Sequence, residues 1–171
     1  DLRVEIEDTL LAMGVGQTEV DRFLRHGYYT MSMQAVLTAS LDTLDGVPGR
    51  PDVMPLVLSA GSEGQARFLV QTLDMLKNYH VEREPLDGLQ VQGTILGTNQ
   101  ASQPVIMAPV DYLSWTETLD RFSSNIGAVS DVPPLLIIDG RTTGRVRDEL
   151  TERGWSLEEM SIIGPKAYPV Q

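Results

Sequence analysis

Residues 133–150, PPLLIIDGRTTGRVRDEL, decide the fold of the second half of the chain. Residues 135–138 are apolar at every position, which is typical of a central strand covered on both faces. The Asp139–Gly140 pair then predicts a tight turn. A helix should follow from about residue 143 to residue 153, and Gly154 and Trp155 are placed for a Schellman end. A buried strand, a turn and a helix in this order predict a unit that combines sheet and helix.

The turn in this stretch is also a candidate anion-binding loop. Helix N-termini present amides and a positive dipole end, glycines permit close backbone approach, and arginines stand nearby. The candidate ligand-binding residues are Asp139, Gly140, Arg141, Thr142, Thr143 and Arg145. The loop matches neither G-x-x-x-x-G-K-[ST] nor G-x-G-x-x-G, so an ordinary turn followed by a helix cap stays open as the alternative.

Residues 88–110 contain no charged residue. Apolar and polar residues alternate from Leu89 to Thr98, and Val105 to Ala108 can return, so a β-hairpin is expected that ends at Pro109. A strand edge without charge lacks the usual protection against pairing. The helical half covers this edge, or the edge pairs with another chain, and the second case motivates a hypothesis of self-association or partner binding.

Aromatic residues in two loops add candidate contact positions. The runs HGYY and VDYLSW contain large side chains with a polar end, which are enriched at interfaces and are also normal at the margin of a core. The candidate interaction residues are Tyr28, Tyr29, Gln90, Gln92, Thr94, Tyr112 and Trp115.

The first half of the chain has the spacing of helices. Apolar residues recur at helical intervals, and Ser62 with Gln65 predicts a capping box for a helix that ends near Tyr79. Caps are expected at Thr18, at Thr30, and at Ser114 or Thr116. The expected buried stripe of the third helix is Met33, Val36, Leu37, Ser40, Leu41 and Leu44. Gly127 should follow the helix of the SWTETLDRFSSNIG run, and a last short strand is expected from Met160 to Ile163.

Composition excludes several classes of protein. The chain has 171 residues, 42% hydrophobic content and a net charge of −11, and it contains no cysteine. The negative charge repels nucleic acid and anionic membranes, and no apolar run is long enough to cross a membrane. His26 and His80 stand far apart without a metal-binding motif, so no metal and no cofactor are expected. Because the sequence begins at Asp1, a fragment or a processed product is expected.

The hydrophobic period changes from 3.6 to 2 near residues 82–88. We therefore expect an α+β fold, with an N-terminal helical bundle followed by a small mixed β-sheet with two helices. The expected subdomains are residues 1–83 and 84–171, with separate cores or one shared core. The function expected is that of a non-enzymatic protein-interaction or ligand-binding domain. The alternative is a small enzyme or sensor that binds an anionic ligand at the Asp139–Arg145 loop.

Overall fold

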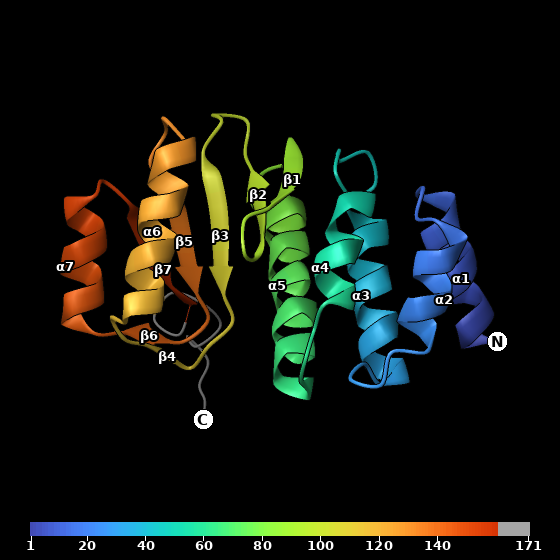
Figure 1. Ribbon diagram of the computed structural model, residues 1–171. Coiled ribbons are helices and arrows are strands. Elements are labelled where there is room, and N and C mark those ends of the chain that lie inside the picture. Colours follow the sequence, from blue (N-terminus) through green and yellow to red (C-terminus); the bar gives the residue numbers. More distant parts are fainter. Residues whose placement is uncertain (161–171) are drawn as a thin grey trace, which may run out of the picture. The chain divides into compact units, whose positions relative to one another are not determined.

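The computed structural model describes residues 1–160 and confirms the α+β fold, with helices first and a mixed five-stranded sheet with two helices after them (Figure 1). The chain divides into two compact units, Asp1–Ile95 and Leu96–Gln171. The subdomain boundary expected between residues 83 and 84 stays a prediction. No helix within residues 1–160 combines the length and the apolar character that a membrane span requires.

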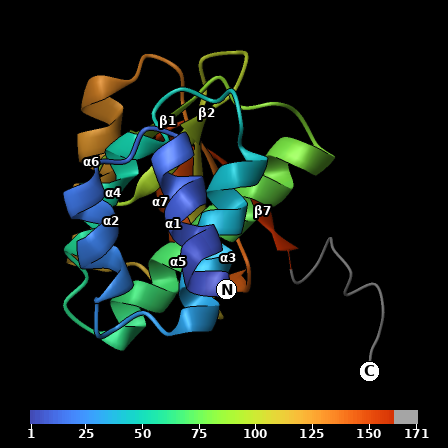
Figure 2. The same cartoon turned by 90° about the vertical axis from the view of Figure 1, so that its right-hand side faces the viewer.

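The first unit is mainly helical. Its elements are α1 (Leu2–Ala12), α2 (Gln17–Leu24), α3 (Met31–Thr43), the 3-10 turn η1 (Pro51–Val53), α4 (Met54–Leu58), α5 (Glu63–Glu82) and β1 (Gly88–Val91). Helix α1 packs on α2 and α3, and α3 packs on α5 (Figure 2). Fully buried leucines on both α3 and α5, among them Leu37, Leu41, Leu73 and Leu76, contribute to the core of this unit.

Local hydrogen bonds explain where these helices begin. Thr30 caps α3 by accepting from the Met33 amide, and Ser62 caps α5 by accepting from the Gln65 amide, both as predicted. The Gln65 side chain reaches one residue further back than a capping box requires, since it accepts from the Gly61 amide.

The predicted cap of α2 at Thr18 is wrong, because that helix begins at Gln17 and Gly16 stands at its N-cap. Helix α1 ends in a Schellman turn: Gly14 has φ +101°, and the amides of Gly14 and Val15 donate to the carbonyls of Leu11 and Leu10. This turn leaves a single residue before α2.

Two further helix predictions differ from the structure. The buried face of α3 includes Gln34 and Thr38, whereas Val36 is 43% exposed. The side of α3 that contacts α1, α2 and α5 therefore differs from the side that its apolar stripe predicts. Helix α5 continues three residues beyond Tyr79 to Glu82, and the His80 ring Nδ1 then accepts the amide of Leu86.

The second unit carries most of the sheet. The elements are β2 (Ile95–Thr98), which begins at the last residue of the first unit, β3 (Pro104–Ala108), β4 (Tyr112–Leu113), α6 (Glu117–Val129), β5 (Leu135–Ile138), β6 (Arg141–Thr142), α7 (Gly144–Glu152) and β7 (Ser156–Glu159). The strand order is β1-β2-β3-β5-β7, and β4 and β6 form a separate parallel pair. β2 pairs antiparallel with β3, and the β3–β5 and β5–β7 pairs are parallel.

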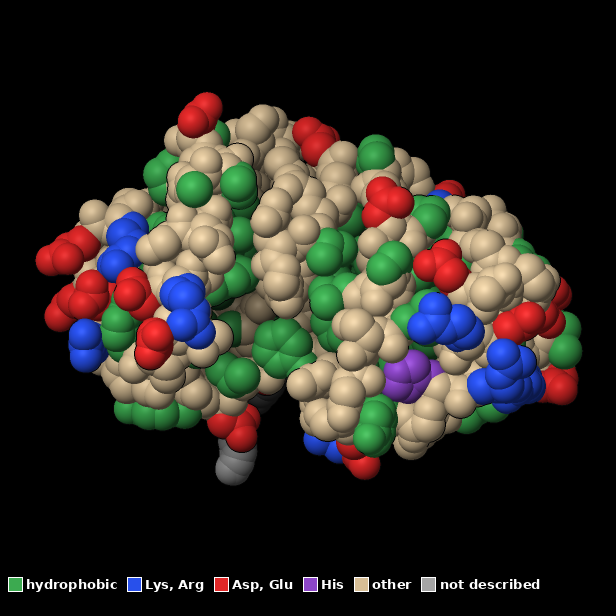
Figure 3. All heavy atoms as spheres, in the orientation of Figure 1, with side chains coloured by type: hydrophobic (Ala, Val, Ile, Leu, Met, Phe, Trp, Pro, Cys, Tyr) green, Lys and Arg blue, Asp and Glu red, His purple; other side chains and the backbone are tan. Residues whose placement is uncertain are grey.

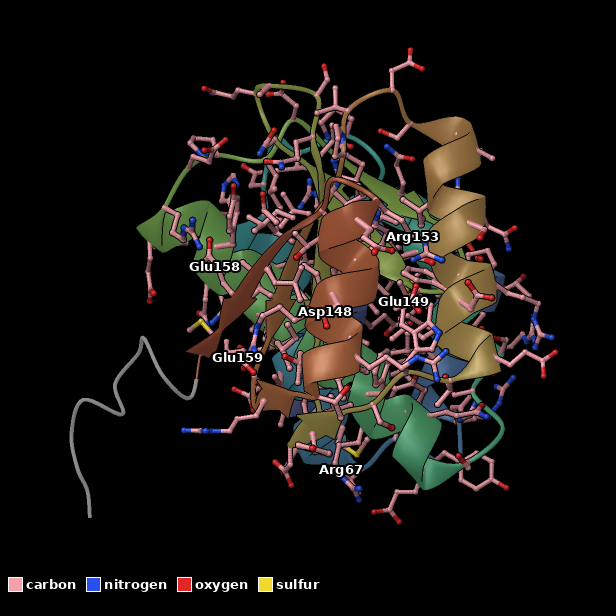
Figure 4. All side chains as sticks on the ribbon, turned by 90° about the vertical axis from the view of Figure 1, so that its left-hand side faces the viewer. Arg67, Asp148, Glu149, Arg153, Glu158 and Glu159 are labelled. Carbon is pink, nitrogen blue, oxygen red and sulfur yellow. The ribbon has the colours of Figure 1, made fainter. Side chains whose placement is uncertain are left out.

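Helices α6 and α7 lie on one face of the strands β3, β5 and β7 (Figures 1 and 4). The chain moves along the sheet in one direction from β3 to β5 to β7. Because connections between parallel strands are right-handed, both connecting helices lie on the same side of the sheet. The core under them combines strand residues such as Ile106 and Ile138 with Ile126, Val146 and Leu150 from the helices.

The central strand and its helix are confirmed. Residues 135–138 are buried at every position in β5, which pairs on both sides. Helix α7 is capped by Thr143, whose hydroxyl accepts the Val146 amide. It ends in the predicted Schellman turn, because the Gly154 amide donates to Thr151 and the amide of buried Trp155 donates to Leu150.

The first strand of the predicted hairpin is broken. Gly93 adopts φ +73°, and the Gln92 amide donates to the Thr94 carbonyl, so the chain turns there and forms β1 and β2 in place of one long strand. The returning strand β3 ends before Pro109 as predicted.

The last helix and strand predictions of the second half also need correction. Gly127 lies inside α6, which continues to Val129, so it does not end that helix. The final described strand is Ser156–Glu159, which the sequence did not predict. The predicted strand from Met160 to Ile163 lies, apart from Met160, outside the described residues.

Candidate functional site

The parallel strands β3, β5 and β7 have their carboxyl ends at one edge of the sheet. This is the edge where α/β sheets commonly bind ligands. The segment after β5 is tied to the segment after β3 by backbone hydrogen bonds. The amides of residues 139, 140, 141 and 143 donate to the carbonyls of residues 108, 110, 111 and 113, at 3.0, 2.9, 2.9 and 3.0 Å. Both loops are therefore held in one conformation.

Gly140 makes this close approach possible. A Cβ atom at this position would lie 1.9 Å from the carbonyl oxygen of Asp111. The expectation that a glycine here permits close backbone approach is correct, but the group that approaches is the neighbouring loop.

A buried carboxylate lies at the start of α7. One oxygen of Glu159 accepts from the Thr142 amide and from the Thr142 hydroxyl at 3.0 Å, and the other accepts from the Arg147 guanidinium at 3.0 Å. The Glu159 side chain is only 10% exposed. We call Thr142 and Arg147 the carboxylate cradle (Figure 4 labels Glu159 at the end of β7, near the first turn of α7).

The cradle favours the ionised form of Glu159. Burial by itself raises the pKa of this carboxyl group, but the hydrogen bonds from Thr142 and the positive charge of Arg147 oppose it and keep the pKa below the ordinary value. The carboxylate is thus held charged at neutral pH.

The predicted anion residues separate into two groups. Thr142 contacts a carboxylate and Thr143 caps α7, whereas Asp139 and Arg141 are exposed and Arg145 pairs with Glu149 at 3.6 Å. Sequence reasoning missed Arg147 and Glu159. An arginine in the first turn of a helix, such as Arg147, is a weak sequence indication of an anion contact. Nothing in the sequence pointed to Glu159, because β7 was not expected.

An exposed tyrosine and an exposed arginine stand side by side at the same edge of the sheet. Tyr112 is 64% exposed, and it faces Arg141 in the register of the β4–β6 pair. Asp111 and Asp139, both exposed, precede these two strands. We call these four residues the Tyr112–Arg141 edge.

The other predicted aromatic contact residues differ in exposure. Tyr28 is 45% exposed, but Tyr29 is buried, donates its hydroxyl to the Val57 carbonyl at 2.7 Å and does not belong to a surface. Burial also raises the pKa of the Tyr29 phenol. Trp115 packs against the core of the second unit, with the Arg153 guanidinium 5.0 Å from its ring centre.

The uncharged strand β1 contacts the loop at Pro48 and Gly49 within the first unit. The Leu89 amide of β1 donates to the Pro48 carbonyl at 2.9 Å, and Gly49 packs against the Leu89 carbonyl. Gln90 is exposed and Gln92 is half-buried, but Thr94 is buried, so it is not available for a contact. The loop before η1 therefore supplies an acceptor for one amide of β1, while Val91 of the same strand stays 38% exposed.

Both histidines are engaged in hydrogen bonds within the first unit. The His26 ring contacts the Leu58 carbonyl through Nε2 at 3.1 Å and accepts the Tyr28 amide through Nδ1, and His80 accepts the Leu86 amide. Within residues 1–160, no three His, Asp or Glu side chains are arranged to hold a metal ion.

Comparisons of the chain with protein-family models, with curated proteins and with solved structures each found no match. A functional proposal for this protein therefore depends on the geometry of its surfaces and loops.

Proposed function

We propose that this chain is a non-enzymatic protein-interaction domain that binds a protein partner through the Tyr112–Arg141 edge. The observation that carries the proposal is a tyrosine held 64% exposed, opposite an exposed arginine in strand register, on a backbone locked by the loop-to-loop hydrogen bonds. Tyrosine and arginine are the residue types that dominate the energetics of protein interfaces, together with tryptophan.

The rigid backbone supports this proposal energetically. Binding is opposed by the entropy lost when loops become ordered, and a loop that is ordered before binding avoids much of that cost. Gly140 and the four backbone hydrogen bonds hold the strands that bear Tyr112 and Arg141. Two side chains would therefore lose freedom on binding, while the backbone under them stays as it is.

The charge of the molecule favours a partner with a basic surface. Its net charge of −11 attracts a basic protein over long range and accelerates encounter. Over α6 and α7, acidic and basic side chains are interspersed on the face seen in Figure 3, and pairs such as Arg153 with Asp120 join them. Asp111 and Asp139 add two negative charges just before β4 and β6, so we expect basic side chains around an apolar contact on the partner.

Two substitutions of equally exposed side chains test the proposal. Tyr112→Ala removes a 64% exposed side chain from the edge, and Val129→Ala removes a 63% exposed side chain from α6. A partner isolated with the wild-type chain should bind Tyr112→Ala at least about 10-fold more weakly, as expected for a hot-spot residue, and should bind Val129→Ala with unchanged affinity. If Tyr112→Ala and Val129→Ala both bind with the wild-type affinity, the partner uses another surface.

Self-association through the same edge has a separate test. Sedimentation equilibrium over a range of concentrations should give a mass that rises with concentration for the wild type and stays monomeric for Tyr112→Ala, if the partner is a second copy. A monomer at every concentration leaves a different protein as the partner.

The anion-binding alternative is separable from this proposal. A rise of the unfolding temperature with phosphate, sulfate or a nucleotide that is lost in Arg141→Ala would support a ligand at the Asp139–Arg145 loop. The geometry supports the anion-binding alternative less well than the interaction surface. The amides of Asp139, Arg141, Thr142 and Thr143 already donate to acceptors within the second unit.

A further inference from the structure

The carboxylate cradle has the composition of an anion receptor. A backbone amide, a hydroxyl group and a guanidinium converge on the two oxygens of one carboxylate, and Arg147 also approaches the Thr142 hydroxyl at 3.4 Å. Hydrogen bonds between a charged donor or acceptor and its partner are about twice as strong as neutral ones. The site is defined by Thr142 in β6 and Arg147 in α7, so it does not depend on a helix terminus alone.

The carboxylate in the cradle comes from a different part of the fold. Glu159 is the last residue of β7, the strand at the end of the strand order, and it stands opposite Ile138 of β5. It lies 17 residues from Thr142 and 12 from Arg147 along the chain. The contact therefore fastens a short terminal strand of the sheet to the loop and helix beside it.

We propose that Thr142 and Arg147 form a carboxylate-binding site that Glu159 occupies from within the chain, so that the site accepts a free monocarboxylate once the Glu159 side chain is absent. In the intact chain the tethered carboxylate has a high effective concentration, so it excludes a small carboxylate at millimolar concentration. Occupation of the site holds β7 at the sheet, and a carboxylate ligand gains access when β7 leaves it.

The test removes the internal carboxylate and supplies another. Glu159→Ala deletes a group about as large as acetate, and Glu152→Ala deletes an exposed carboxylate at the end of α7 as the matched control. Glu159→Ala should lower the unfolding temperature by about 3 to 10 °C, because the donors of the cradle lose their acceptor. Glu152→Ala should change it by less than about 1 °C.

Three sodium salts, compared at one ionic strength of about 0.3 M, then identify the ligand class. Sodium acetate should return Glu159→Ala at least a third of the way towards the wild-type unfolding temperature, compared with sodium chloride, and it should leave the wild type and Glu152→Ala unchanged. Acetate that acts no better than chloride on Glu159→Ala overturns the proposal. Sodium sulfate that restores as much as acetate, after its effect on the wild type has been subtracted, overturns the carboxylate class.

Two further measurements separate occupancy of the site from general stabilisation. Hydrogen exchange of the amides in residues 156–159 should accelerate in Glu159→Ala and slow again in acetate, as expected if the contact holds β7. The double variant Glu159→Ala with Arg147→Ala should lose the response to acetate, and a response that persists in it overturns the assignment. Should Glu159→Ala not fold in chloride, refolding in acetate must recover its circular dichroism signal, and failure to recover counts against the site.

Discussion

Substitution of Gly140 by alanine should destabilise the second unit strongly. The added Cβ would lie 1.9 Å from the Asp111 carbonyl oxygen and 2.3 Å from its carbonyl carbon, inside the 3.0 Å limit that real Cβ contacts respect. The two loops must therefore separate by about 1 Å or more, because backbone atoms on both sides cannot rotate away.

The size of the effect follows from the hydrogen bonds that this movement breaks. The Gly140 amide donates to Val110 and the Arg141 amide donates to Asp111, both at 2.9 Å. Each such bond contributes about 1 kcal/mol net, and strained packing adds to the loss, so we expect a decrease of about 2 to 4 kcal/mol in the free energy of unfolding.

Urea unfolding followed by tryptophan fluorescence measures this effect in the second unit, because both tryptophans, Trp115 and Trp155, belong to it. The matched control is Gly127→Ala, at a helical position where an added Cβ meets nothing within 4 Å. It should increase the free energy of unfolding by about 0.5 to 1 kcal/mol. A Gly140→Ala variant within about 0.5 kcal/mol of the wild type would refute the reasoning about this contact.

Three other predictions concern single side chains. Arg153→Ala should lower the free energy of unfolding by about 1 to 2 kcal/mol in the same assay, since it removes the ion pair with Asp120 and the cation contact over Trp115, and Arg153→Lys should recover less than half of that loss. Thr72→Val should raise the free energy of unfolding by about 1 kcal/mol, because the buried Thr72 hydroxyl has no hydrogen-bond partner among the described residues; urea unfolding followed by circular dichroism checks this, and a decrease contradicts it. Because the pKa of the Glu159 carboxyl group is lowered in the folded chain, the unfolded chain binds a proton there more readily. The contribution of Glu159 to stability is therefore complete above the ordinary carboxyl pKa of about 4.3 and is lost as the pH falls through the lowered pKa. Unfolding midpoints measured from neutral pH into this acid range should show a smaller decrease for Glu159→Gln than for the wild type.

The sequence predicted the elements whose signals are local. The Thr143 hydroxyl caps α7 by accepting a hydrogen bond from the amide three residues later. Gly154 and Trp155 end the same helix with hydrogen bonds to its last turn. The run at residues 135–138 is apolar throughout, and a strand that pairs on both sides and is buried on both faces requires that composition. Such features depend on neighbours along the chain, so they can be inferred without knowledge of the fold.

The candidate site could be predicted only in part. The sequence singled out the loop and Thr142, which contacts the Glu159 carboxylate, but the arginines that it singled out were Arg141 and Arg145. Arg147 is the arginine that reaches the carboxylate, because the start of α7 turns its side chain towards β6 and β7. Side-chain direction within a helical turn depends on where the neighbouring strands lie, which the sequence alone does not contain.

By itself, therefore, the sequence determined the class of fold, the central strand, the caps of α3, α5 and α7 and the negative charge. Tertiary structure decided that Thr142 donates to the carboxylate of Glu159, that the Pro48 carbonyl accepts from the Leu89 amide of β1, and that Tyr29 is buried while Tyr112 is exposed. The physical reason is the distance along the chain. A cap joins residues three positions apart, whereas the contact of Thr142 with Glu159 spans 17 positions and exists only through the register of β5 with β7.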